Sequence, residues 1–514
     1  MTPKSFAVPT YVKMCILTSL IGFLFGYDTG SIGPVTTMAE FKAVMGDFSD
    51  TIRGVVVSSS LITGAASASI AGILADRYGR IRISALGACI DGVGVAIECA
   101  SPVLGVFILG RLIKGIGAGL YLSTIYVQVS EMSPARYRGV LTSIPQFIIV
   151  IGLIAGYFVC YGTSNIKDSS LAWRLPLAIA SFAAFVLAVA VCFVPPSPRW
   201  FLTKGELEKA RVVVQRLGFG QAEQDELLAQ QQDEMPADAV EPSLATSIVH
   251  MFRDFREAFR QPYRSRTIFG CLIMAMQQFS GIDGVLYYAP LLFQNAGLKS
   301  TEASFLASGV SGLVIFAITI PATLLADHWG RRTASILGGV LVSVLMLLMG
   351  SLYAADQVHG AGRWVVIVCI YLFAISFNGT WGIVFRIYLV ESLPRKTRSS
   401  ASSLAQSANW VANYIVALVT PVLLSASTSG AYFFFGGMTV ICTVIVTLYM
   451  VETRGATLEA IEQAYTDRMA SKALKRKAEK TTIETNSAEA SSFELGRTEK
   501  KEFTTVSETF VESE

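Results

Sequence analysis

Long apolar runs alternate with short polar segments along most of the chain. Each run holds about 20 or more mostly apolar residues, the length of helix that crosses the hydrocarbon core of a bilayer. The runs lie near residues 11–34, 54–74, 83–101, 104–129, 140–161, 175–194, 267–295, 303–324, 333–353, 363–391, 398–424 and 431–451. This pattern predicts an all-α membrane protein with about twelve spanning helices.

Two longer polar segments interrupt or follow this pattern. Residues 195–266 contain "GELEKARVVVQRLG" at helical spacing, followed by an acidic, Gln-rich stretch. We interpret them as a cytosolic linker with short amphipathic helices. The predicted organisation is a six-helix bundle at 1–194, the linker at 195–266, a second six-helix bundle at 267–453 and a cytosolic tail at 454–514. After about residue 467 the tail is rich in Lys, Glu, Ser and Thr, which is typical of disorder.

Composition supports a membrane protein and argues against several other classes. Of 514 residues, 52% are hydrophobic and only 15% are charged, whereas soluble domains have about 25% charged residues. The net charge of +3 gives no indication of nucleic-acid binding. The run at 11–34 is too long for a cleavable signal peptide and contains Asp28, so we expect a retained spanning helix. The eight cysteines form no C-x-x-C pair, so we expect free thiols and no metal site.

Basic residues mark one set of loops, and the loops on the other side carry fewer of them. The first set holds Arg77, Arg80, Arg82, Arg136, Arg138, Arg331, Arg332, Arg395, Lys396 and Arg398; the alternate set holds Lys42, Arg53, Lys167, Arg174, Lys299 and Arg363. Cytosolic loops carry an excess of Lys and Arg. We therefore expect both termini and the linker in the cytosol.

The two halves of the chain repeat each other. "GILADRYGR" (72–80) matches "TLLADHWGR" (323–331), and "EMSPARYRG" (131–139) matches "ESLPRKTRS" (391–399). Because each half has an even number of spans, both halves enter the membrane in the same orientation. Such a parallel repeat is typical of transporters that rock two bundles about a central site.

These motifs, with several others, resemble the sugar porter family of the major facilitator superfamily, and most closely its fungal members. The resemblance covers about residues 10–465 and is carried by "GYDTG" (26–30), "GRLIKGIGAGL" (110–120), "PPSPRWFL" (195–202), "QQFSGIDGVLYYAP" (277–290) and "VETRG" (451–455). It implies a major facilitator fold and import of a pentose or hexose with protons. Beyond the proton as coupling ion it implies no cofactor. We expect a monomer in the plasma membrane.

Asp28 lies inside the first predicted span, where an ionised carboxylate needs a partner. The resemblance implies that this partner is Arg111 and that the pair couples transport to protons. Loss of the Asp28 charge would change the balance between conformers. The alternative is a static ion pair that only joins two helices.

The resemblance also assigns two other groups of residues. Amide and aromatic side chains suit sugar hydroxyls and sugar rings, and the implied sugar site comprises Phe25, Gln146, Gln277, Gln278, Tyr287, Tyr288, Asn409, Trp410 and Asn413. The implied cytosolic gate comprises Asp76, Arg80, Glu131, Arg138, Asp327, Arg331, Glu391 and Arg398. We expect the gate pairs to stabilise the outward-facing form, although they could be solvated charges that only set topology.

Two positions depart from the family pattern. Asp283 stands where family members usually have Asn, and Arg386 where they usually have Trp, and both positions line the implied sugar cavity. Arg386 could pair with Asp283 and keep the cavity neutral for a neutral sugar, which is the interpretation we favour. Alternatively, Arg386 could bind the carboxylate of a sugar acid in bidentate fashion.

Two other classes of function remain. A non-transporting sugar sensor would share this fold, but sensors usually have longer tails and weakened coupling residues. An enzyme is disfavoured because His250, His328 and His359 are scattered and no nucleophile–base or metal-ligand spacing occurs.

Overall fold

Twelve helices in the described part of the chain are long and apolar enough to cross a membrane. The computed structural model describes residues 8–221, 224, 244–298, 300–325, 329–394, 397–455, 463 and 465. Six of the spans lie in residues 10–191 and six in residues 264–449. The prediction of an all-α protein with two six-helix halves is therefore confirmed.

The N-terminal half begins at the first described helix and ends before the linker. Its elements are α1 (Thr10–Ser19), α2 (Gly22–Thr37), α3 (Ala39–Met45), α4 (Asp50–Tyr78), α5 (Arg80–Ala100), α6 (Leu104–Glu131), η1 (Ala135–Tyr137), α7 (Arg138–Leu141), α8 (Ile144–Thr163) and α9 (Leu171–Val191). In the linker, α10 (Pro198–Thr203), α11 (Leu207–Leu217) and α13 (Leu244–Ala258) are short helices, as predicted.

The C-terminal half repeats this arrangement. Its elements are α14 (Arg264–Phe279), α15 (Ile282–Tyr287), α16 (Ala289–Asn295), α17 (Thr301–Leu325), α18 (Arg331–Ala354), α19 (Ala361–Gly379), α20 (Trp381–Ser392), α21 (Arg398–Ala426) and α22 (Thr428–Tyr449). The predicted acidic part of the linker and the predicted tail lie almost entirely outside the described residues.

Two spans of the C-terminal half are broken near the middle of the bundle. Between α14 and α15, Gly281 has φ +88°, a conformation that glycine adopts without a Cβ clash. Between α19 and α20, Thr380 has φ −130° and ψ −85°. Broken spans leave backbone polar groups that are tolerated only inside protein or along a water-filled cavity. Both breaks therefore point to a polar site between the halves.

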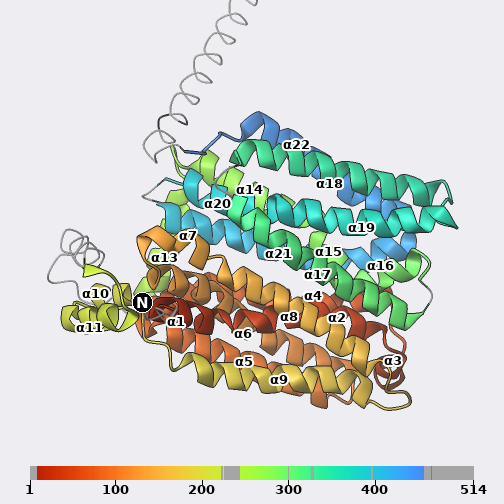
Figure 1. Cartoon of the computed structure of the whole chain (residues 1–514), viewed down its shortest axis with the longest axis horizontal. Helices are drawn as coiled ribbons and strands as arrows, with labels where there is room; N and C mark the ends of the chain where they lie inside the picture. Colours follow the sequence, from red (N-terminus) through yellow and green to blue (C-terminus); the bar gives the residue numbers. More distant parts are fainter. Residues whose placement is uncertain are drawn as a thin grey trace, which may run out of the picture. The chain divides into compact units, whose positions relative to one another are not determined.

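Long helices from the two halves lie side by side, with α1–α9 on one side of the bundle and α14–α22 on the other (Figure 1). The halves meet where α4 packs on α21 and α8 packs on α17. We call the end at which α5, α7, α18 and α21 begin the basic end, because each of these helices starts with an arginine. The linker helix α10 lies there too, since Trp200 Nε1 donates to the carbonyl of Asp76 at 2.8 Å.

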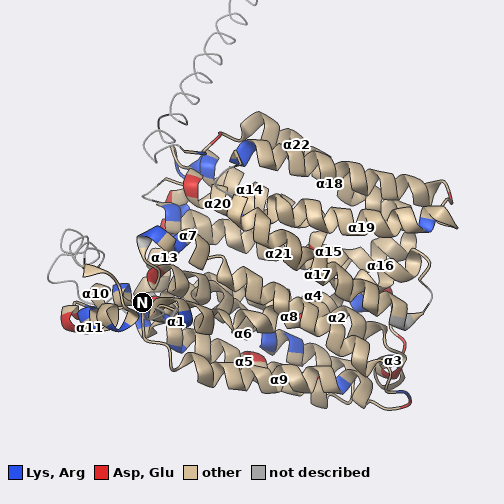
Figure 2. Cartoon of the chain, viewed as in Figure 1, with Lys and Arg blue, Asp and Glu red and all other residues tan. Residues whose placement is uncertain are grey.

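The halves are in close contact at the opposite end. Gly33 of α2 lies against the carbonyl of Tyr287 in α15 so tightly that a Cβ at this position would clash. The Tyr157 hydroxyl of α8 also donates to the carbonyl of Leu286. Figure 2 shows many charged residues at the basic end, and a smaller group of them inside the N-terminal half.

Candidate functional site

A cavity of about 1090 Å³ lies between the halves and extends from the middle of the bundle to the basic end. Residues of the basic end, including Asp76, Arg80 and Ser399, line its mouth. The side chains from the predicted sugar site that line it are Phe25, Gln146, Gln277, Gln278, Asp283, Arg386, Asn409, Trp410 and Asn413. Tyr287 and Tyr288 are buried outside its lining.

Three amide side chains form the floor of this cavity. Asn409 Nδ2 donates to Gln277 Oε1 at 3.3 Å, and Gln278 Nε2 donates to Asn409 Oδ1 at 3.2 Å. Gln277 Nε2 is held by the carbonyl of Trp381 at 2.8 Å, at the break between α19 and α20. Gln278 Oε1 and Asn413 Oδ1 are buried and accept no hydrogen bond within the described part of the chain. Both oxygens therefore lack a donor in this conformation.

An aromatic surface borders these amides. Trp410 of α21 and Phe25 of α2 meet edge to face, with ring centroids 5.8 Å apart. Gly64 of α4 lies under the Trp410 ring and leaves it room, because a Cβ there would come within 2.8 Å of the ring. Apolar ring faces beside hydrogen-bonding groups suit a sugar, whose C–H face and hydroxyls need different partners.

Arg386 and Asp283 both reach the cavity, but they do not form the direct ion pair favoured from the sequence. Arg386 is exposed to the cavity, and its guanidinium donates to Gln146 Oε1 at 3.4 Å. It therefore points from α20 toward α8 of the other half. Asp283, in the first turn of α15, interacts with the charge of Arg386 at a distance. The two side chains form no hydrogen bond or ion pair in this conformation. In this conformation the pair is separated because the arginine bridges the two halves.

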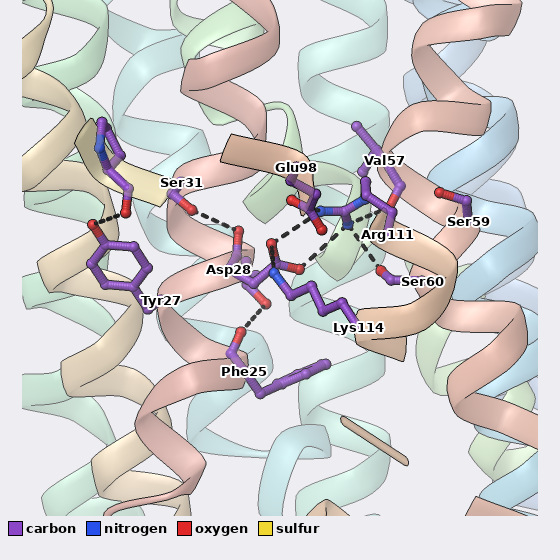
Figure 3. Close-up of polar contacts among 12 residues, drawn as sticks. Phe25, Tyr27, Asp28, Ser31, Val57, Ser59, Ser60, Glu98, Arg111 and Lys114 are labelled. Atoms are coloured by element: carbon purple, nitrogen blue, oxygen red, sulfur yellow. Dashed lines mark hydrogen bonds and ion pairs between the residues drawn. The ribbon is translucent and has the colours of Figure 1, made fainter. Parts of the chain in front are cut away.

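Asp28 belongs to a buried ion cluster in the N-terminal half (Figure 3). Arg111 donates to both of its carboxylate oxygens, at 3.0 and 3.3 Å, so the predicted pair is present. Lys114 forms a second ion pair with Asp28. The guanidinium is also fixed by the Val57 carbonyl and the Ser60 hydroxyl, each at 2.9 Å. Asp28 itself does not line the cavity, whereas its neighbours Gly26 and Thr29 do.

Three charged members of this cluster were missed in the sequence analysis. Lys114 lies one turn after Arg111, and Asp91 and Glu98 come from α5. Glu98 Oε2 is 3.8 Å from Arg111 Nη1. The helices α5 and α6 approach closely because glycines face each other: a Cβ on Gly110 would come within 2.7 Å of the carbonyl of Gly94. A search for every charge inside an apolar run would have found all three residues.

At the basic end of the N-terminal half, Arg80 links two carboxylates. Its Nη2 lies 2.7 Å from Asp76 Oδ1 and 3.2 Å from Glu131 Oε1. Asp76 is largely exposed, with 72% of its side chain accessible, whereas Arg80 is buried. Arg138 is half-buried at the start of α7. These ion pairs lie within one half.

The C-terminal half has a corresponding network with an additional member. Arg331 binds Glu391 through Nη2 at 3.0 Å and through Nε at 3.3 Å. Glu452 accepts hydrogen bonds from the backbone N–H groups of Arg331 and Arg332, at 2.7 and 3.1 Å, and so caps the start of α18. Thr453 donates to Glu391 at 2.6 Å.

The remaining predicted gate residues are less informative. Arg398 donates to the carbonyl of Leu393 at 3.1 Å, and Asp327 lies outside the described residues. Glu452 was missed, although it belongs to the "VETRG" motif. The sequence does not reveal that Glu452 caps α18, because the motif follows α22. Only the folded structure brings it to the start of α18.

Comparison with known proteins points to one family. The sequence model of the family "Sugar (and other) transporter" matches residues 14–465. The glucose transporter GlcP of Staphylococcus epidermidis is 33% identical over 88% of this chain and 97% of its own length. The high glucose sensor RGT2 of Saccharomyces cerevisiae is 31% identical over 88% of this chain but only 60% of its own length. The partially occluded inward-open structure of the xylose transporter XylE from E. coli superposes with a TM-score of 0.71, at 26% identity over 87% of this chain and 99% of that chain.

Proposed function

The chain belongs to the sugar porter family of the major facilitator superfamily, and from this premise we propose that it imports a monosaccharide together with protons by alternating access. It is a multi-pass membrane protein and a sugar transporter. The observation that carries the proposal is the Asp28–Arg111 ion pair, which is buried directly behind a polar cavity that is open at one end.

The cavity offers suitable chemistry for a neutral pentose or hexose. Gln278 Oε1 and Asn413 Oδ1 supply acceptors, and the amide groups that surround them supply donors. Trp410 supplies an apolar face. Hydrogen bonds to these fixed amides favour a polyhydroxylated ligand, because an apolar ligand would leave buried polar atoms unpaired.

We assign the basic end to the cytosol, with both termini on that side and the plasma membrane as the location. The assignment follows from the excess of Arg and Lys at this end. The cavity is then open to the cytosol, and the contact of Gly33 with Tyr287 closes the outer side. In this state Arg80 and Arg331 pair within their own halves. In the outward-facing state the two basic ends approach each other, and the gate charges then stabilise the closed cytosolic side.

Proton coupling follows from the charge of Asp28. While it is ionised, Asp28 holds Arg111 and Lys114 by ion pairs. Protonation removes the charge that holds them and changes the relative stability of the two conformers. A membrane potential adds about 2.3 kcal/mol per charge per 100 mV to drive entry. The protein acts as a monomer in this scheme, and the proton is its only coupling ion.

A specific observation favours sugar acids as a second candidate class of substrate. Arg386 is exposed in the cavity and is held by an amide rather than by a carboxylate. A guanidinium of this kind can bind a carboxylate through two parallel hydrogen bonds. Similarity to the glucose sensor RGT2 raises sugar sensing without transport as a further candidate function. The match covers only 60% of the length of RGT2, however, so that protein is much longer than this chain.

Uptake into proteoliposomes tests these possibilities together. The full-length protein is supplied with labelled glucose, xylose and other pentoses and hexoses, and with galacturonate and glucuronate, at two external pH values. We expect one neutral sugar to accumulate against its gradient when the outside is acidic. Uptake at the same rate and extent with and without a proton gradient would indicate a facilitator. Sugar binding without uptake would indicate a sensor. Strong inhibition by uronates with weak inhibition by their parent sugars would establish the sugar-acid alternative.

A further inference from the structure

The buried charges of the N-terminal half do not balance. Asp28, Asp91 and Glu98 are 8%, 2% and 0% exposed, and the two cations among them, Arg111 and Lys114, are 1% and 4% exposed. If all five groups were ionised, the cluster would hold one uncompensated negative charge. An unpaired charge inside protein is costly to bury. A single proton on one of the three carboxyl groups removes this cost.

Glu98 is the one of these three carboxyl groups that has both oxygens enclosed and without a hydrogen-bond donor. Neither of its oxygens accepts a hydrogen bond within the described part of the chain, and Arg111 is 3.8 Å away. Asp28, by contrast, has two hydrogen bonds from Arg111 and an ion pair with Lys114. Asp91 also makes no hydrogen bond or ion pair within the described residues, but only its Oδ1 is fully enclosed.

The other groups that face Glu98 do not supply the missing charge. From α9, Arg174 donates to the carbonyls of Cys99 and Ser101, so its guanidinium is held by main-chain atoms. From α4, Ser60 and the Val57 carbonyl bind Arg111. On α6, Tyr121 is fully buried, and its hydroxyl makes no hydrogen bond within the described residues. Arg111 and Lys114 are therefore the cations that must serve all three carboxyl groups.

We propose that Glu98 is a second proton-binding group, which holds a proton while Asp28 is ionised and passes that proton to Asp28 during transport. The inference rests on the proposed proton coupling. In the transfer an O–H bond breaks at Glu98 and an O–H bond forms at Asp28. Arg111 then exchanges the Asp28 carboxylate for that of Glu98, closing the gap of 3.8 Å. The cluster stays neutral before and after the step, and no charge is left unpaired.

The positions of the two carboxyl groups give the transfer a direction. Glu98 lies two residues before α5 ends at the end opposite the basic one. Asp28 lies between Gly26 and Thr29, which line the cavity that opens at the basic end. Figure 3 shows Arg111 reaching Asp28, with Glu98 beside its guanidinium. Glu98 is thus placed to load from the closed, outer side, and Asp28 to release toward the cavity.

Infrared difference spectroscopy of the full-length protein in lipid tests the resting state without any sugar. We expect the unmodified protein at neutral pH to show the C=O band of a buried, protonated carboxyl. The band should be absent from Glu98→Gln and displaced in Glu98→Asp. It should keep its position in Asp91→Glu, which preserves the charge of the cluster. A missing band in the unmodified protein, or a band that is displaced in Asp91→Glu and not in Glu98→Asp, overturns the proposal.

Proton-driven uptake of labelled glucose and xylose tests the transfer itself. Glu98→Gln should shift the pH profile of uptake toward acid by about one unit, a tenfold loss of apparent proton affinity, because protonation of Asp28 then leaves Arg111 without an acceptor. Ser84→Ala is the matched control, since Ser84 is also buried on α5 and bonds to Thr124 of α6. Ser84→Ala should leave the pH profile unchanged. Glu98→Asp, which keeps a carboxyl group, should show a smaller acid shift than Glu98→Gln.

The outcomes separate this inference from the function on which it rests. If the unmodified protein shows no proton-driven uptake, the proposed coupling fails and the relay fails with it. If the unmodified protein is coupled but Glu98→Gln and Ser84→Ala give the same profile as the unmodified protein, the relay alone is wrong.

Discussion

Gly33 is a position at which one added methyl group should change the conformational equilibrium. In α2 it lies against the carbonyl oxygen of Tyr287, where the two halves meet at the closed end of the bundle. A Cβ on Gly33 would fall more than 1 Å inside the 3.0 Å that real Cβ atoms keep from other atoms. The obstacle is a main-chain oxygen, which cannot turn aside as a flexible side chain would.

The magnitude follows from this geometry. Gly33→Ala must separate α2 from α15 or strain one of them, and overpacking of this kind costs about 1–3 kcal/mol. In the outward-facing form α2 and α15 are expected to separate, so the added methyl group does not destabilise that form. Since about 1.4 kcal/mol corresponds to a factor of ten, the variant should shift the equilibrium toward the outward-facing form by roughly fivefold to 150-fold.

Electron–electron spin distances between labels at Asn165 and Ser425 would measure the shift. Both sites are exposed at the closed end, one in each half, and the exposed Cys89 and Cys192 would first be replaced by alanine. We expect longer distances and slower uptake in Gly33→Ala. Gly162→Ala is the control, because a Cβ there meets nothing within 4 Å. An unchanged distance distribution in a folded Gly33→Ala protein would refute the assignment of this contact as the outer closure.

Four further results are expected. Asp28→Asn should abolish uphill accumulation of sugar in proteoliposomes while exchange down a gradient persists. Glu391→Gln should slow turnover, because the Arg331 pair is lost, while calorimetric binding stays within about tenfold, or 1.4 kcal/mol. Burial raises the pKa of Glu452, but backbone hydrogen bonds lower it further, so it lies below its usual 4.5. The stability that Glu452 gives is therefore present above that pH and is lost as the pH falls through the lower folded value, and Glu452→Gln should flatten the acid side of a plot of Tm against pH. Arg386→Trp with Asp283→Asn should support uptake of a neutral sugar and remove any uptake of uronates.

The spans and the repeat were predictable because they depend on local properties of the chain. Apolar runs such as 171–191 must be helical in a bilayer whatever surrounds them. The matching "ADRYGR" and "ADHWGR" segments place Arg80 and Arg331 at equivalent helix ends. The interruption at Thr380 was not predicted. Nothing in the run around it contains proline, and the break is stabilised by tertiary contacts such as the bond from Gln277 to the carbonyl of Trp381.

Partners of charged side chains were harder to predict than their positions. The resemblance gave the pair of Asp28 with Arg111, but Lys114 was passed over although it occupies the same helix one turn later. Lys114 faces Asp28 because α6 packs closely on both α4 and α5. That packing depends on glycines of separate helices meeting in space, and a single sequence does not show which glycines meet.

Arg386 shows why some partners cannot be read from a sequence even when both residues are identified. Arg386 and Asp283 lie on α20 and α15 of the same half, so their spacing does not change greatly when the halves rock. Gln146 lies on α8 of the other half, 3.4 Å from Arg386, and in the proposed alternating-access cycle this distance changes. In the conformation described here the basic end is open and Arg386 binds across the cavity to Gln146. In the proposed cycle this bond breaks when the halves rock, and the guanidinium becomes available to Asp283 or to a substrate carboxylate. The partner of Arg386 then depends on the step of the cycle, and the uronate competition tests which partner it takes when sugar is bound.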